Sequence, residues 1–137
     1  MYLFNVLDIA GSGMSAQALR LNTTASNLAN AESASSSSGE TYRARQPVFA
    51  AMIKALGESP SGTGVQVRGI VESQAPLRQQ YEPGNPLANE EGYIFLPNVS
   101  MVEEMANMIS ASRSYQSNSE VAKTSKQLLM RTLSLGE

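Results

Sequence analysis

The side chains that most often perform chemistry are scarce in this sequence. It contains no His and no Cys, which excludes a Ser-His triad, a Cys nucleophile, a disulfide framework and a zinc finger. Glu103 and Glu104 are adjacent carboxylates, but neighbouring residues of a helix point about 100° apart. We therefore expect these residues to stabilise the start of a helix and not to form a general acid–base pair.

The glycine-rich and serine-rich segments do not fit nucleotide-binding or nucleophilic sites. Gly57, Gly62 and Gly64 lack the Gly-Lys-Ser/Thr that completes a P-loop, and Gly11-Ser12-Gly13 has no strand before it. Ser35–Ser38 offers hydroxyl groups without a base to activate them. The sequence predicts no enzyme activity, no catalytic or metal site and no cofactor.

The charge balance argues against binding to nucleic acid. Ten Lys and Arg residues stand against twelve Asp and Glu residues, a formal net charge of -2, whereas nucleic-acid binders usually carry a basic surplus. A basic patch on the middle region is conceivable, but a solvated sheet face is the more common arrangement for its arginines, Arg43, Arg45, Arg68 and Arg78. We expect neither nucleic acid nor a small-molecule substrate as a partner.

Residues 2–31 have the pattern of a long helix with very little charge. Asp8 and Arg20 are its only charged residues, and Gly11 and Gly13 are expected to weaken the helix and to mark a bend or a close helix approach. Heptad spacing of this kind is typical of helices that pack against other helices, although an amphipathic helix on its own domain remains an alternative. One seam contains Leu7, Met14, Leu21 and Leu28, and the second contains Leu3, Ala10, Gln17, Thr24 and Ala31.

Residues 99–135 predict a second long helix. Ser100 followed by Glu103 forms a capping-box pattern, and Gly136 is a plausible stop. Because one partner helix needs one apolar stripe, the additional stripe in the last turns indicates two neighbours. The seams are Met101, Met108, Tyr115, Ala122 and Leu129; then Met105, Ser112, Ser119, Lys126 and Leu133; the additional stripe is Val121, Leu128 and Leu135.

The middle region, residues 32–98, predicts a small β unit. It begins with the low-complexity stretch Ser33–Gly39, for which we expect little order. Alternation and turn residues then predict strands near 42–53, 65–72, 79–82 and 93–96, with a bulge at Gly69. The expected fold class is α+β, with segments 1–31, 32–98 and 99–137. The terminal helices pair as a coiled-coil-like layer.

No segment is long enough to span a membrane, which takes about 20 apolar residues. The first residues lack the basic region of a signal peptide, and Asp8 interrupts the apolar run. We therefore interpret them as mature sequence. Charged residues make up 16% of the chain, against about 25% in a typical soluble domain. This composition suits a protein whose surfaces are covered by neighbours.

Several separate motifs resemble those of the flagellar rod and hook family, and they occur in the same order along the chain. Asn-Leu-Ala-Asn at 27–30 is similar to the element that closes the first helix of that family. Motifs in the middle and at the end agree with it: Ser73–Pro76, Tyr81–Ala88, Gly92-Tyr93, Leu96–Val99, Glu103–Met105, Ser112–Asn118 and Leu128–Gly136. The resemblance covers nearly the whole chain.

The resemblance implies a structural subunit of the bacterial basal-body rod, the drive shaft that transmits torque and encloses the export channel. It implies export by the flagellar type III apparatus without a cleaved signal, and a location in the periplasm. Implied partners are copies of itself, other rod proteins, the junction protein that links the rod to the membrane ring, and the export apparatus. The expected assembly residues are Leu7, Met14, Leu21, Asn27, Leu28, Asn30, Met101, Met105, Met108, Tyr115, Leu129 and Leu133.

Two other classes of function remain open from the sequence. One is a secreted binding module that grips its partner through the middle β unit. The other is an enzyme that acts on peptidoglycan, although the sequence offers neither metal ligands nor an acid pair suited to a cleft.

Overall fold

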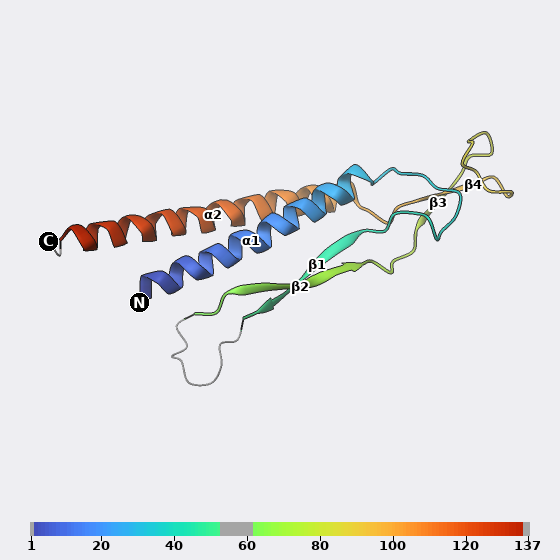
Figure 1. Ribbon diagram of the computed structural model, residues 1–137. Coiled ribbons are helices and arrows are strands. Elements are labelled where there is room, and N and C mark those ends of the chain that lie inside the picture. The colour runs from blue at the N-terminus through green and yellow to red at the C-terminus, as the bar shows by residue number, and fades with distance from the viewer. Residues whose placement is uncertain (1, 53–61, 136–137) are drawn as a thin grey trace.

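Two long antiparallel helices from the two ends of the chain dominate the structure. The computed structural model describes residues 2–52 and 62–135. Helix α1 (Tyr2–Ala29) and helix α2 (Met101–Ser134) lie side by side, with the chain termini at the same end of the molecule (Figure 1). Two small antiparallel sheets lie between them in sequence, so the expected α+β class is confirmed. Neither helix is long and apolar enough to cross a membrane.

The longer hairpin packs along α1. It consists of β1 (Arg45–Ala51) and β2 (Val65–Glu72), paired antiparallel from the Arg45–Glu72 pair to the Ala51–Val65 pair. Helix α1 lies between this hairpin and α2 (Figure 1). Helix α2 therefore packs against α1 on one side only, while α1 is covered on two sides.

The bulge expected at Gly69 is present in β2. Gly69 lies opposite Val48, but the next pair joins Phe49 to Val67. Arg68 is therefore the extra residue, and the strand shifts its register at this point.

The first strand begins later than expected, at Arg45 and not at Tyr42. The reason is that the preceding residues bond outside the hairpin. The Tyr42 hydroxyl bonds to α1, and the Ala44 amide donates to Asn98 Oδ1 at 2.8 Å. The expected continuation of the strand to Ile53 and part of the 57–64 loop lie outside the described residues.

A shorter hairpin occupies the end of the molecule opposite the termini (Figure 1). It pairs β3 (Arg78–Tyr81) with β4 (Tyr93–Leu96), and the rings of Tyr81 and Tyr93 meet edge to face. Ser35 forms a bridge with Phe95 through two backbone hydrogen bonds of 2.9 Å. The expectation that little orders the Ser33–Gly39 stretch is therefore wrong at Ser35.

Local side-chain hydrogen bonds cap the end of α1 and the start of α2. Ser100 caps α2, because its side chain accepts a hydrogen bond from the Glu103 amide. At the end of α1, the Asn30 side chain donates to the Ser26 carbonyl at 2.8 Å. The stop expected at Gly136 lies outside the described residues.

Small residues let the two helices approach closely. The buried apolar residues in the helices are alanines: Ala10, Ala16 and Ala111. A Cβ atom added to Gly13 would lie 2.8 Å from Asn118 Nδ2 on α2, which confirms the close approach expected there. One added to Gly11 would meet nothing within 4 Å, so the expected close approach is absent at that glycine. A second small core, made of Ala31, Ala44 and Val99 with Tyr42 packed against it, lies where the helices meet the β unit.

Candidate functional site

The side chain of Asn27 joins three parts of the fold at one buried point. It is 1% exposed, and its Nδ2 donates to the Arg45 carbonyl at 2.8 Å and to Glu104 Oε2 at 3.1 Å. Its Oδ1 accepts from the Tyr42 hydroxyl at 2.8 Å and from the Arg45 amide at 2.9 Å. Both donors and both acceptors of the amide are thus used. We call Asn27, Tyr42, Arg45 and Glu104 the Asn27 junction.

The junction adds a second role to one of the adjacent carboxylates, which both lie at the start of a helix as expected. Both residues lie in the first turn of α2, but only Glu103 is exposed. Glu104 is 6% exposed and accepts from Asn27 on α1, so it links the two helices. A carboxylate is buried only where a hydrogen bond or a cation compensates it.

Three asparagines toward the end of the first helical segment have different roles. The sequence leaves open whether Asn22, Asn27 and Asn30 face solvent or bond across packed helices. Asn22 is exposed, Asn27 bonds across to α2 and β1, and Asn30 bonds back to the end of α1. Asn27 is therefore the one that fixes the relative position of these elements.

Three of the four arginines make specific bonds, although Arg45 and Arg78 are exposed on their strands as expected and only Arg43 is half-buried. Arg43 donates to the carbonyls of residues 73 and 75, and Arg78 donates to the carbonyls of Ala31 and Pro97. Arg45 pairs with Glu72 at 3.3 Å and lies over the Tyr42 ring. Arg68 is also exposed, and among the described residues it makes no such bond.

The seams of α1 differ in burial. The second seam supplies the buried residues Ala10, Thr24 and Ala31. The first seam, expected to form part of the assembly surface, is half-buried at Leu7, Met14, Leu21 and Leu28. These four side chains therefore remain partly open to solvent in the isolated subunit.

The seams of α2 are not the line that contacts α1. The buried residues of α2 are Glu104, Ala111 and Ser125, which share a heptad position beside the first expected seam, on the side away from the second. Among the expected assembly residues, Met108 and Leu129 are half-buried, and Met101, Met105, Tyr115 and Leu133 are exposed. The intramolecular contact thus uses small and polar residues, while the large apolar residues of α2 face elsewhere.

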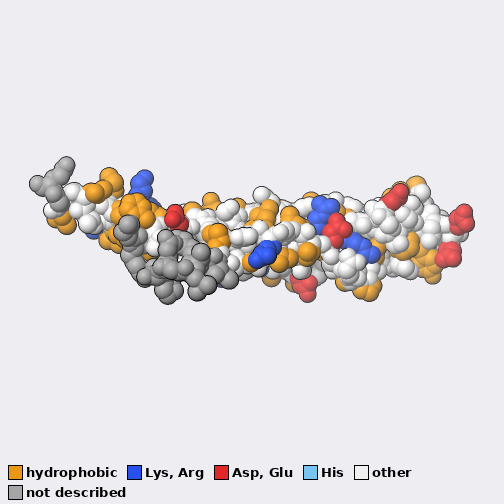
Figure 2. Space-filling view, turned by 60° about the horizontal axis from the view of Figure 1, so that its bottom comes forward, with side chains coloured by type: hydrophobic (Ala, Val, Ile, Leu, Met, Phe, Trp, Pro, Cys, Tyr) orange, Lys and Arg blue, Asp and Glu red, His pale blue; other side chains and the backbone are white. Residues whose placement is uncertain are grey.

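Helix α2 consequently presents a long apolar surface. Leu133 is 70% exposed and Leu135 is 87% exposed. Figure 2 shows the face of the elongated molecule on the side of the β1–β2 hairpin, where hydrophobic and charged side chains are interspersed. The exposed large apolar residues of α2 and its C-terminal end are Met101, Val102, Met105, Ile109, Tyr115, Val121, Leu128, Met130, Leu133 and Leu135. We call this set the α2 apolar surface.

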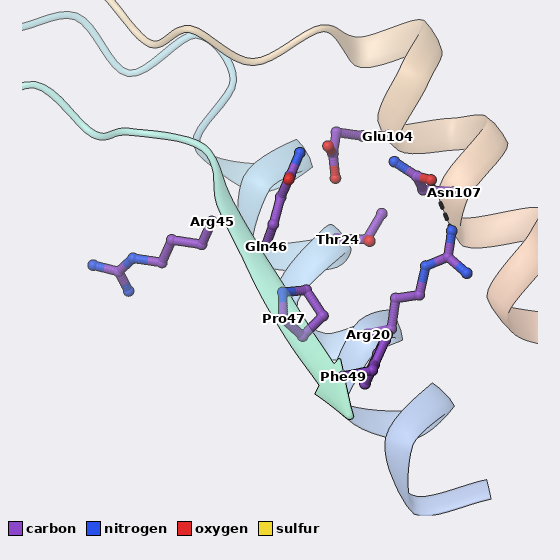
Figure 3. A pocket seen from close by; sticks show the side chains of 8 residues that line it. All are labelled: Arg20, Thr24, Arg45, Gln46, Pro47, Phe49, Glu104 and Asn107. Atoms are coloured by element: carbon purple, nitrogen blue, oxygen red, sulfur yellow. Dashed lines mark hydrogen bonds between the residues drawn. The ribbon is translucent and has the colours of Figure 1, made fainter. Parts of the chain in front are cut away.

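An open pocket of about 350 Å³ lies beside the Asn27 junction, between α1, α2 and β1 (Figure 3). Within it, an Arg20 guanidinium nitrogen donates to Asn107 Oδ1 at 2.9 Å. The lining residues are Arg20, Thr24, Arg45, Gln46, Pro47, Phe49, Glu104 and Asn107. We call it the Thr24 pocket. The sequence does not predict this pocket. The one hint in the sequence is the polar residue Thr24, which occupies a seam position where an apolar residue is usual.

The described residues contain no group of three or more His, Cys, Asp or Glu side chains that could hold a metal ion. The geometry offers helix packing, a buried polar junction and a large apolar surface. These features suit assembly with other chains.

Comparison with known proteins identifies the family. The family profile of flagella basal body rod proteins matches residues 7–32, and that of the C-terminal region of flagellar basal body rod FlgEFG proteins matches residues 90–135. The flagellar basal-body rod protein FlgC of Escherichia coli O6:H1 is 52% identical over 137 residues, all of both chains. The chain belongs to the FlgC family of flagellar basal-body rod proteins.

Other FlgC proteins agree with this assignment. That of Salmonella typhimurium strain LT2 is 52% identical over the full length of both chains, and that of Aquifex aeolicus is 46% identical over 96% of each. The chain is thus a structural subunit of the rod of the flagellar basal body, where it assembles with other rod components. The two family matches cover most of α1 and all of α2.

Proposed function

We propose that this rod subunit polymerises through α1 and α2, which form the inner layer of a shaft around the export channel and transmit torque along it. The observation that carries the proposal is the α2 apolar surface. Helix α1 covers one side of α2, and no strand of the described residues packs on its other sides. Stripes of exposed large apolar side chains on one helix are candidate protein–protein contact sites.

The two directions of the α2 apolar surface fit two different neighbours. One stripe contains Val121, Leu128 and Leu135, which recur every seven residues. A different side of the same turns carries Met130 and Leu133. A helix that offers separate stripes can contact one chain on each. Contacts between unlike surfaces that do not close into a ring produce an open helical filament.

This arrangement gives the terminal segments and the middle segment different roles. We propose that segments 1–31 and 99–137 are the assembly segments, and that segment 32–98 lies outside them. The Asn27 junction then holds the outer segment at a fixed position on the helices. Torque carried by the helices would pass to the β unit through these bonds.

The same proposal includes the location and the remaining partners. The subunit is exported by the flagellar type III apparatus without a cleaved signal and assembles in the periplasm. There it contacts copies of itself and the protein that joins the rod to the membrane ring. It has no catalytic role. The support is the membership of the FlgC family together with the low charge of the chain.

The test is a charge placed on the α2 apolar surface. Leu133→Asp changes a side chain that is mostly exposed in the subunit, so the subunit itself should fold normally. In a dry interface an unpaired carboxylate costs several kcal/mol, and the variant should be exported yet absent from purified basal bodies. Gln79→Asp, on exposed β3, is the control that adds the same charge away from both helices.

The secreted fraction must be measured first, because a variant that is not exported says nothing about packing. Normal swimming with normal incorporation of Leu133→Asp would contradict the proposal. If Gln79→Asp blocked incorporation instead, the β unit would be the binding surface.

A further inference from the structure

The two ends of the molecule carry opposite charges. The loop that joins β3 to β4, residues 82–92, contains acidic residues and no basic one, whereas residues 121–135, which end α2, contain basic residues and no acidic one. The charged residues are Glu82, Glu90 and Glu91 in the loop and Lys123, Lys126 and Arg131 in the helix. At the end that holds β3 and β4, Figure 2 shows acidic side chains and no basic ones. The charge of the subunit therefore changes sign along its long axis.

These charges are not paired with one another or with other groups of the subunit. Among the described residues the one salt bridge lies on the β1–β2 hairpin. Glu90 and Glu91 are exposed in the loop, and Lys123 and Lys126 are exposed on α2. Glu82 differs, because its carboxylate accepts hydrogen bonds from two side chains of its own hairpin. Glu90, Glu91 and the two lysines are thus available to groups of opposite charge on another chain.

Exposed apolar side chains accompany the charges at each end. In the loop, Leu87 is 46% exposed. On α2, Lys123, Lys126, Met130 and Leu133 are spaced by three, four and three residues, so they share one face of the helix. Met130 is 62% exposed there. We call these four residues the lysine face of α2, and residues 82–92 the β3–β4 loop.

The β3–β4 loop and the lysine face cannot meet within one subunit. The β3–β4 hairpin and the chain termini lie at opposite ends of the molecule (Figure 1). From Met101 to Lys126 alone, α2 rises about 38 Å. Contact therefore requires a second copy of the chain. Because it joins unlike surfaces at opposite ends, such a contact repeats from head to tail.

We propose that the β3–β4 loop of one copy docks on the lysine face of the next copy along the rod. Glu90 and Glu91 then face Lys123 and Lys126, and Leu87 meets the apolar half of the face. The charges favour this pairing, and the like charges of two loops or of two lysine faces oppose the alternatives. The proposal rests on the assembly role proposed above, and it names what covers the end of the α2 apolar surface. Strand β3 itself lies outside the contact.

Exchanging the charges tests this contact in purified basal bodies. Glu90→Lys with Glu91→Lys, or Lys123→Glu with Lys126→Glu, sets like charges against each other. Each pair should lower the amount of subunit in basal bodies, relative to the secreted amount, about ten-fold. Because the partner is a second copy, all four substitutions together recreate opposite charges and should restore incorporation. Normal incorporation of either pair, or continued exclusion of the combined variant, would overturn the contact between copies, while Leu133→Asp separately tests the assembly role.

A disulfide between copies gives a second test that does not depend on export of the charge-exchanged variants. The chain has no Cys, so in basal bodies with Glu90→Cys and Lys126→Cys, oxidation should link copies into multimers that join residue 90 to residue 126. The matched control replaces Lys126→Cys by Arg113→Cys, which is also exposed on α2 but lies about 20 Å along the helix. That separation is too long for a disulfide, whose Cα atoms lie within about 7 Å. Absence of the link between residues 90 and 126, or equal linking in the control, would overturn the proposal.

Discussion

Replacing Asn27 by Ala should be among the most damaging single changes in the subunit. The truncation removes four hydrogen bonds and leaves their partners at a buried point. Three of the bonds are between neutral groups, at about 1 kcal/mol each, and the bond to the Glu104 carboxylate contributes about 2 kcal/mol. Water entering from the adjacent Thr24 pocket recovers part of this sum, so the expected loss of unfolding free energy is about 4 kcal/mol.

Asn22→Ala is the matched control for this prediction. It lies on the same helix and is exposed, so it carries the same change in helix propensity, about 0.5 kcal/mol in favour of Ala, without losing the junction. Urea unfolding of the purified chain, followed by circular dichroism, measures both variants. With a typical dependence on urea, the Asn27→Ala midpoint should fall by about 2 M.

A graded variant checks the reasoning within the junction. Tyr42→Phe removes only the hydroxyl that donates to Asn27 Oδ1, and should cost about 1 kcal/mol. The account of the junction is refuted if Asn27→Ala and Asn22→Ala differ by less than about 1 kcal/mol. It is equally refuted if Tyr42→Phe costs as much as Asn27→Ala.

Two further pairs of variants test the packing of the helices and the anchoring of the β unit. A Cβ atom added to Gly11 would meet open space, whereas one added to Gly13 would meet the Asn118 amide at 2.8 Å. Gly11→Ala should therefore raise stability by up to about 1 kcal/mol and Gly13→Ala should not, and equal melting temperatures would contradict the close approach. Arg78→Gln, which loses two bonds to backbone carbonyls, should cost about 2 kcal/mol in urea unfolding, while exposed Arg68→Gln should stay within about 0.5 kcal/mol. Equal losses in these two variants would show that the carbonyl bonds do not anchor the β unit.

The sequence predicts the two helices, the four strands and the fold class because each rests on a local period or turn. It does not predict which face of α2 turns inward, whereas the second seam of α1 supplies the buried residues Ala10, Thr24 and Ala31. A heptad pattern reflects every apolar contact that a helix makes, including contacts with other chains. On α2 the residues buried within the subunit are instead Glu104, Ala111 and Ser125. Small residues do not stand out in the hydrophobic pattern of the sequence. They nevertheless stabilise the contact between α1 and α2, because they let the two helices approach closely.

The Asn27 junction could not be derived from the sequence for a different reason. The partners of Asn27 come from residues 15 to 77 positions away, so no local pattern brings them together. The Asn-Leu-Ala-Asn motif points to the right residue through family resemblance, but the local pattern around its partner Glu104 indicates only helix capping. Long-range pairing of polar side chains becomes visible only once the fold places them.

The burial of the α2 apolar surface in the rod tests the central claim most directly. Because the chain has no Cys, single-Cys variants report accessibility without background, and a thiol reacts only where reagent reaches it. Met105→Cys and Leu133→Cys should be labelled readily in the purified subunit and at least about ten-fold more slowly in purified basal bodies. Gln79→Cys should react at the same rate in both. Equal labelling of Met105→Cys and Leu133→Cys in the free and assembled states would contradict assembly through α2.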